Sequence, residues 1–179
     1  MFCKSLIINA YFSGTPIACA ISKDKSMKML NDLVVFIVDD DQFCQALYRQ
    51  YLMNIGFKNV HTFDKGPDCI DMLNLSPDII FVDFNMDPYN GLELLNMVKR
   101  THPSIYMLMI SGQKDIHIAL EAMEQGAFDY IVKDDGVFKM INKSVNKIFQ
   151  SIAKMSECNN CNLNVSTNHD NLLAGFNFA

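Results

Sequence analysis

The sequence lacks an excess of positive charge and has no long hydrophobic run. Its 179 residues contain 15 Lys and Arg against 20 Asp and Glu, which gives a formal net charge of -5. No global positive field therefore draws the chain to nucleic acid or to anionic lipid. No stretch reaches the roughly 18 uninterrupted apolar residues that a membrane-spanning helix needs. We expect neither a nucleic-acid partner nor a membrane partner.

The six cysteines are not arranged in a pattern that indicates disulfides or zinc. Cys44 and Cys69 lie inside apolar patterns, where a reduced cysteine behaves as a small hydrophobic residue. Cys158 and Cys161 form a single CxxC pair, whereas a structural zinc site needs four ligands. The cysteine pattern therefore favours a reduced, cytoplasmic chain.

The length and the 50% content of hydrophobic residues indicate one folded domain rather than two. Residues 1–30 are interpreted as a poorly ordered N-terminal extension and residues 31–152 as the domain. Residues 153–179 are rich in Asn and read as a polar C-terminal tail. No helix-turn-helix pattern follows residue 152, so we expect output through another protein rather than through DNA.

Five short apolar runs alternate with longer segments of helical periodicity. This alternation predicts an α/β fold of (βα)5 type, with a doubly wound parallel sheet covered by helices on both faces. Continuous rather than alternating apolar character indicates strands that are buried on both sides. The runs are 33–38, 60–63, 79–82, 105–110 and 129–132, and the helical segments are about 43–55, 66–76, 91–100, 115–125 and 137–152.

Polar side chains stand at the carboxyl ends of four of these strands. In a doubly wound sheet these ends form the crevice where ligands bind. The residues are Asp39, Asp40 and Asp41 after the first strand, Asp83 at the third, Ser111 at the fourth and Lys133 at the fifth. Asp41 stands at the start of the first helix and is interpreted as complementing the helix dipole.

The remaining polar residues suit phosphoryl transfer with a divalent cation. Mg²⁺ takes a few carboxylates, keeps waters and shares substrate phosphate oxygens, so it would hold the crowded carboxylates of Asp39, Asp40 and Asp83 in their ionised form. Asp83 can attack phosphorus if the metal and Lys133 neutralise the phosphoryl oxygens. Ser111 can then donate a hydrogen bond to the acyl phosphate.

Four ordered motifs at compatible spacings resemble the receiver domain of two-component response regulators, in the stand-alone, chemotaxis-type arrangement. The resemblance covers about residues 31–152 and implies a flavodoxin-like sheet of five strands in the order 2-1-3-4-5. The motifs are FIVDDD (36–41), PDIIFVDFNMDPYNG (77–91), MLMISG (107–112) and GAFDYIVKD (126–134).

The resemblance assigns a role to each site residue. Asp83 would be the phosphoacceptor and Lys133 the invariant lysine. Asp39, Asp40 and Asp83 would bind Mg²⁺ together with the backbone carbonyl of Asn85. Ser111 and Tyr130 would stand at the positions of the switch hydroxyl and the rotating aromatic residue, and Asn85 and Gln113 at the two positions that flank the attacking water.

The implied activity is phosphorelay signal transduction. The donor would be a phosphohistidine on a sensor histidine kinase or a phosphotransfer protein. The receiver would catalyse its own phosphorylation and dephosphorylation on aspartate without being a conventional turnover enzyme. Phosphorylation would then change the face formed by helix 4, strand 5 and helix 5, which would bind a downstream protein target or a second copy in a homodimer.

Two departures from the family pattern keep alternatives open. Lys133 is followed by Asp134 where the family usually has proline, so we expect a trans peptide bond there. The proline after the phosphoacceptor comes one position late, in Met86-Asp87-Pro88. One alternative is a pseudo-receiver, an interaction module that switches without phosphate. Another is a phosphohydrolase with an aspartate nucleophile, although that class needs a second carboxylate where this chain has Asn85.

Overall fold

The computed structural model describes residues 30–165, with side chains described through Lys154. Almost all of the extension expected at residues 1–30 therefore lies outside the described residues, as does the segment 166–179. Strands and helices alternate as the apolar runs predict. The elements are β1 (Val34–Val38), α1 (Gln42–Asn54), β2 (Asn59–Phe63), α2 (Gly66–Asp71), β3 (Ile79–Asp83), α3 (Gly91–Thr101), β4 (Tyr106–Ser111), α4 (Ile116–Glu124), β5 (Asp129–Val132) and α5 (Val137–Val165), with short 3-10 turns at Leu30–Asp32 and Leu73–Leu75.

The five strands form one parallel sheet in the order β2-β1-β3-β4-β5. The fold class and the strand order expected from the sequence are therefore confirmed. Val38 pairs with Val82, and Asp83 pairs with Ile110. Ser111 at the end of β4 pairs with Val132 at the end of β5. This register brings the carboxyl ends of four strands to one edge of the sheet.

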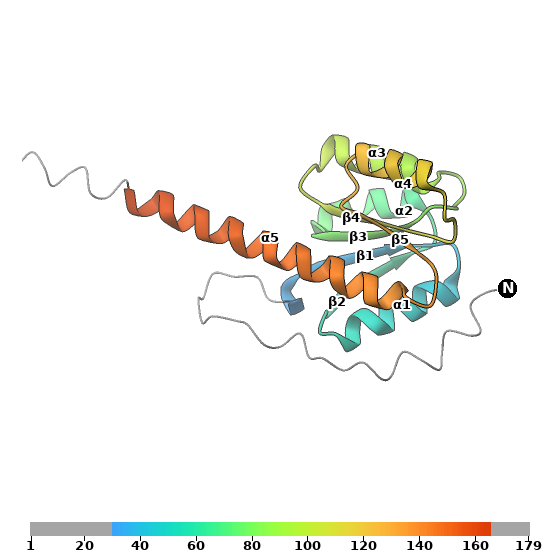
Figure 1. The fold of residues 1–179 in the computed structure, drawn as a ribbon, viewed down its shortest axis with the longest axis horizontal. Helices are drawn as coiled ribbons and strands as arrows, with labels where there is room; N and C mark the ends of the chain where they lie inside the picture. The colour runs from blue at the N-terminus through green and yellow to red at the C-terminus, as the bar shows by residue number, and fades with distance from the viewer. Residues whose placement is uncertain (1–29, 166–179) are drawn as a thin grey trace, which may run out of the picture.

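Helices cover both faces of the sheet, with α1 and α5 on one side and α2, α3 and α4 on the other (Figure 1). Each face of the sheet packs against its helices in a separate hydrophobic core, and alternate residues of a strand point into the two cores. In β1, Val35 and Ile37 pack in the core beneath α1 and α5, while Phe36 and Val38 pack in the other. Burial on both faces explains why the strands are apolar without alternation.

Local signals in the sequence begin and end the helices. Asp41 caps α1 by accepting hydrogen bonds from the backbone N–H groups of Phe43 and Cys44. Asn90 and Glu93 form a capping box at the start of α3. Asp41 therefore serves the start of α1, as its position in the sequence predicts, and leaves Asp39 and Asp40 for the strand-end site.

Helix α5 is longer than the periodicity predicts. It continues to Val165, past residue 152, where the expected helix ends. No glycine or proline interrupts residues 153–165, so no residue in this segment breaks the helix. Its C-terminal part projects away from the body of the domain (Figure 1). No helix within residues 30–165 is both long and apolar enough to cross a lipid bilayer.

Candidate functional site

The structure brings the predicted acids together at the carboxyl edge of the sheet. Carboxylate oxygens of Asp39, Asp40 and Asp83 lie within 4.8 Å of one another. Asp39 and Asp83 are buried, with 2% and 6% of their surface exposed, while Asp40 is exposed to solvent. Three oxygen donors that are open on one side match the ligands that Mg²⁺ prefers, because this ion keeps several waters. The donor set therefore fits a magnesium ion.

Lys133 reaches into this acidic cluster from the end of β5. Its Nζ lies 2.6 Å from Oδ1 of Asp83 and 2.8 Å from Oδ2 of Asp39. Asp134 stands where the family usually has proline, yet the lysine contacts both buried acids. Among the described residues, the cis peptide bond is Asp87–Pro88, so the bond after Lys133 is trans as predicted.

Burial and charge act in opposite directions on the ionisation of this cluster. Burial raises the pKa of Asp39 and of Asp83 above the ordinary aspartate value, although Lys133 opposes this effect. Burial alone would lower the pKa of Lys133, but the two carboxylates together raise the pKa above its ordinary value. The cluster therefore holds one firmly protonated lysine beside carboxylates that bind protons more readily than exposed aspartates.

The raised pKa values predict that protons compete with magnesium. Mg²⁺ would bind the ionised carboxylates, so its binding should displace the protons that Asp39 and Asp83 retain above the ordinary aspartate pKa. We expect Mg²⁺ affinity to fall, and proton release per ion to rise, as the pH is lowered from about 8 to about 5.5. Calorimetric titration in two buffers of different ionisation enthalpy measures both quantities. Equal affinity at the two pH values, without proton release, would contradict the prediction.

The backbone around Asp83 is held closely. The N–H of Asn85 donates to Oδ2 of Asp83 at 2.7 Å, and Oδ1 of the same carboxylate faces Lys133. Gly91 begins α3 directly against this segment, where a Cβ atom would overlap the Asp83 carbonyl oxygen and approach the terminal methyl of Met109 to 2.7 Å. The phosphoacceptor candidate therefore has one oriented carboxylate and little room to shift.

Ser111, Gln113 and Tyr130 form a hydrogen-bonded group beside the acids. Ser111 is fully buried, and its Oγ accepts a hydrogen bond from the N–H of Gln113 at 3.1 Å. The hydroxyl of Tyr130 donates to the Gln113 carbonyl at 3.1 Å. The Gln113 side chain reaches Asn85, with Nε2 3.3 Å from Oδ1. Gln113 thus links the two switch candidates to the loop after Asp83.

Sequence reasoning missed one contributor to the site, Gln45. It lies on the buried face of α1, and its amide contacts the carbonyl of Asp39. The available signal was a polar residue among the apolar positions Cys44, Tyr48 and Leu52 of one helix face. The histidines His61 and His102 are exposed and take no part in the cluster.

Comparison with known families agrees with this geometry. Residues 35–144 match the family described as response regulator receiver domain. The chain belongs to this family. The match begins in β1 of the receiver domain and ends within α5, so it includes every strand end that contributes to the acidic cluster.

The receiver domain has relatives among longer regulatory proteins. It is 31% identical over 115 residues to the regulatory protein LuxO of Vibrio vulnificus strain YJ016, covering 62% of this chain and 25% of LuxO. It is 33% identical over 101 residues to the DNA-binding transcriptional regulator NtrC of Klebsiella pneumoniae, covering 56% of this chain and 21% of NtrC. The chain thus spans about a quarter or less of the length of these two relatives.

Solved structures show the same fold. A CheY-like receiver domain protein from Methanospirillum hungatei JF-1 superposes with a TM-score of 0.62 at 19% identity, covering 69% of this chain and 98% of that one. NtrX from Brucella abortus gives a TM-score of 0.61 at 24% identity, covering 69% of this chain and 29% of NtrX. At these identities the likeness establishes the architecture of the receiver domain.

Proposed function

We propose that this receiver domain takes a phosphoryl group onto Asp83 from a phosphohistidine of a sensor histidine kinase or a phosphotransfer protein. Asp39, Asp40, Asp83 and the backbone carbonyl of Asn85 would hold Mg²⁺. The observation that carries the proposal is the position of the Lys133 ammonium, in contact with two buried acids beside a third. This arrangement supplies the charge stabilisation on which phosphoryl transfer depends.

Each residue has a defined part in the transfer. A carboxylate oxygen of Asp83 attacks phosphorus, the bond from phosphorus to the donor imidazole breaks, and the imidazole leaves with the electron pair. Lys133 neutralises a phosphoryl oxygen, and the N–H of Asn85 keeps the carboxylate oriented. Bound Mg²⁺ supplies further neutralisation of the phosphoryl oxygens. Ser111 turns its hydroxyl from Gln113 to the new acyl phosphate.

The signal would leave through the face formed by α4, β5 and α5. When Ser111 moves, its hydrogen bond to Gln113 is lost and the loop at Gln113 changes conformation. Because the Tyr130 hydroxyl bonds to this loop, the tyrosine ring moves as well. Ile116, Leu120 and Met123 occupy one stripe of α4 and are 64%, 54% and 46% exposed. Such a stripe suits a protein partner, either a downstream target or a second copy.

We place this signalling in the cytoplasm and assign it to a domain of residues 31–152.

Intact mass spectrometry tests the proposal. With Mg²⁺ and acetyl phosphate we expect the chain to gain one phosphoryl group, and Asp83→Asn or removal of Mg²⁺ to abolish the gain. Asp87→Asn, an exposed acid in the same loop, is the matched control and should be phosphorylated like the wild type. Phosphorylation should also alter hydrogen exchange in α4 and β5. A folded wild-type chain that gains no phosphoryl group would favour the pseudo-receiver.

A further inference from the structure

Gln45 is a polar residue on the buried face of α1. It follows Asp41 by one helical turn and stands beside Cys44 and near Tyr48, which both pack in the core. Only 7% of its surface is exposed. A buried amide without hydrogen-bond partners is costly, so the groups that satisfy it define its role.

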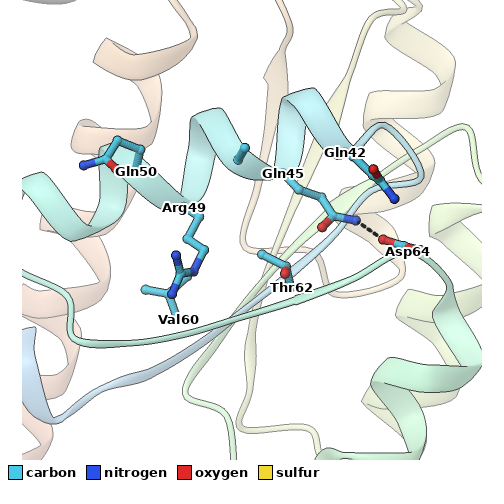
Figure 2. A pocket seen from close by; sticks show the side chains of 8 residues that line it. Gln42, Gln45, Arg49, Gln50, Val60, Thr62 and Asp64 are labelled. Atoms are coloured by element: carbon cyan, nitrogen blue, oxygen red, sulfur yellow. Dashed lines mark hydrogen bonds between the residues drawn. The ribbon is translucent and has the colours of Figure 1, made fainter.

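Both N–H groups of the Gln45 amide have partners. Nε2 lies 2.5 Å from the backbone carbonyl oxygen of Asp39 and 2.6 Å from Oδ1 of Asp64. Both partners are acceptors, so the amide nitrogen must face them. If the amide were flipped, its oxygen would face two oxygens. Figure 2 shows the side chain reaching from α1 to Asp64, which follows β2. One amide therefore ties the turn after β1 to the turn after β2.

The carbonyl that Gln45 holds belongs to the most buried acid of the site. The N–H of Asp39 donates to the carbonyl of Phe63 at 3.1 Å. Its Oδ1 accepts from the N–H of Asp41 at 3.0 Å, and its Oδ2 accepts from Lys133 at 2.8 Å. With the bond from Gln45, every polar group of Asp39 has a partner. Gln45 thus completes the set of bonds that fixes this residue.

We propose that Gln45 is a positioning residue for the magnesium site. By holding the Asp39 carbonyl, it sets the direction in which the Asp39 and Asp40 carboxylates leave the end of β1. A neutral amide provides two donors without adding a positive charge that would oppose the cation. The inference rests on the proposed function, because Gln45 acts on the cation only through Asp39 and Asp40.

Magnesium affinity of the full chain, without a phosphodonor, tests the inference. Gln45→Met keeps a side chain of similar length but removes both donors. We expect this variant to bind Mg²⁺ about tenfold more weakly, as is typical when a partner that orients a metal ligand is lost. Gln50→Met is the matched control, because Gln50 lines a groove between α1 and β2 together with Gln45, but its amide donates to Asn54, away from the acidic cluster. It should bind Mg²⁺ like the wild type.

Two further measurements separate positioning from general stability. Hydrogen exchange without metal should be faster at the Asp39–Asp41 turn in Gln45→Met, while exchange in β3 and β4 stays unchanged. Asp64→Ala alters an exposed residue and removes one of the two acceptors, so a smaller loss of Mg²⁺ affinity should follow. Wild-type affinity in Gln45→Met overturns the inference, and so does wild-type affinity in Asp64→Ala if Gln45→Met does not fold.

The wild-type chain separates this inference from the proposed function. If it binds Mg²⁺ but gains no phosphoryl group from acetyl phosphate, the proposed function fails. The Mg²⁺ affinities of the wild type and Gln45→Met then still test the role of Gln45. If it gains the phosphoryl group and Gln45→Met binds Mg²⁺ normally, only the role of Gln45 fails.

Discussion

Lys133→Met is expected to destabilise the Mg²⁺-free domain by about 3 to 5 kcal/mol near neutral pH, because it leaves two buried carboxylates without a cation. Asp39 and Asp83 would then protonate more readily, so the loss should shrink as the pH falls toward about 5. Without the competing ammonium, Mg²⁺ should bind more tightly and restore part of the lost stability. Phosphorylation by acetyl phosphate should nevertheless slow, because the phosphoryl oxygens lose a neutralising charge.

Urea unfolding at the two pH values, with chelator and with Mg²⁺, measures these effects. Lys147→Met is the matched control, because Lys147 pairs with Asp129 at 3.2 Å and its side chain is 50% exposed. An exposed ion pair contributes only about 0 to 1 kcal/mol, so this control should change little. If both variants lose the same free energy of unfolding, the contacts of Lys133 contribute no more to stability than a surface ion pair does.

Gly91→Ala is expected to destabilise the domain by about 1 to 3 kcal/mol, the usual range for overpacking. The new methyl group would overlap the Asp83 carbonyl and approach the Phe84 Cα to 3.1 Å. Both are backbone atoms, which cannot turn aside as a side chain can. Relief of the overlap therefore moves Asp83 itself, and the rate of phosphorylation should fall together with the stability.

A second glycine near the site gives the control for this prediction. A Cβ atom on Gly112 would meet no atom within 4 Å, so Gly112→Ala should leave stability within about 0.5 kcal/mol of the wild type. Thermal unfolding and the rate of phosphorylation from acetyl phosphate compare the two variants. If Gly91→Ala is as stable and as active as Gly112→Ala, the close approach of α3 to Asp83 has no consequence.

The sequence was enough to predict the fold and the meeting of the acids with the lysine. Apolar runs mark the strands because both faces of the sheet are buried. In a parallel sheet the residues that follow the strands must gather at one edge. Asp39, Asp40, Asp83 and Lys133 could therefore be placed together without knowledge of any side-chain contact, and the structure brings them together.

Features that depend on contacts between distant segments could not be predicted in this way. The bond from Gln45 to Asp64 depends on the packing of α1 across β2, and the restriction at Gly91 depends on how closely α3 approaches β3. The partner of the Tyr130 hydroxyl is a backbone carbonyl, which carries no residue-specific signal. The length of α5 was missed because the core-facing periodicity stops where the helix leaves the sheet, while the helix itself continues.

The long α5 gives the domain a mechanical property. It begins four residues after Lys133 and runs for 29 residues, which at 1.5 Å per residue is about 43 Å. The part beyond residue 152 extends roughly 20 Å from its support on the sheet. A tilt of about 10° at that support would carry the far end through roughly 3 to 4 Å over this length. Any tilt of α5 at its support on the sheet would therefore be amplified into a larger displacement at its far end.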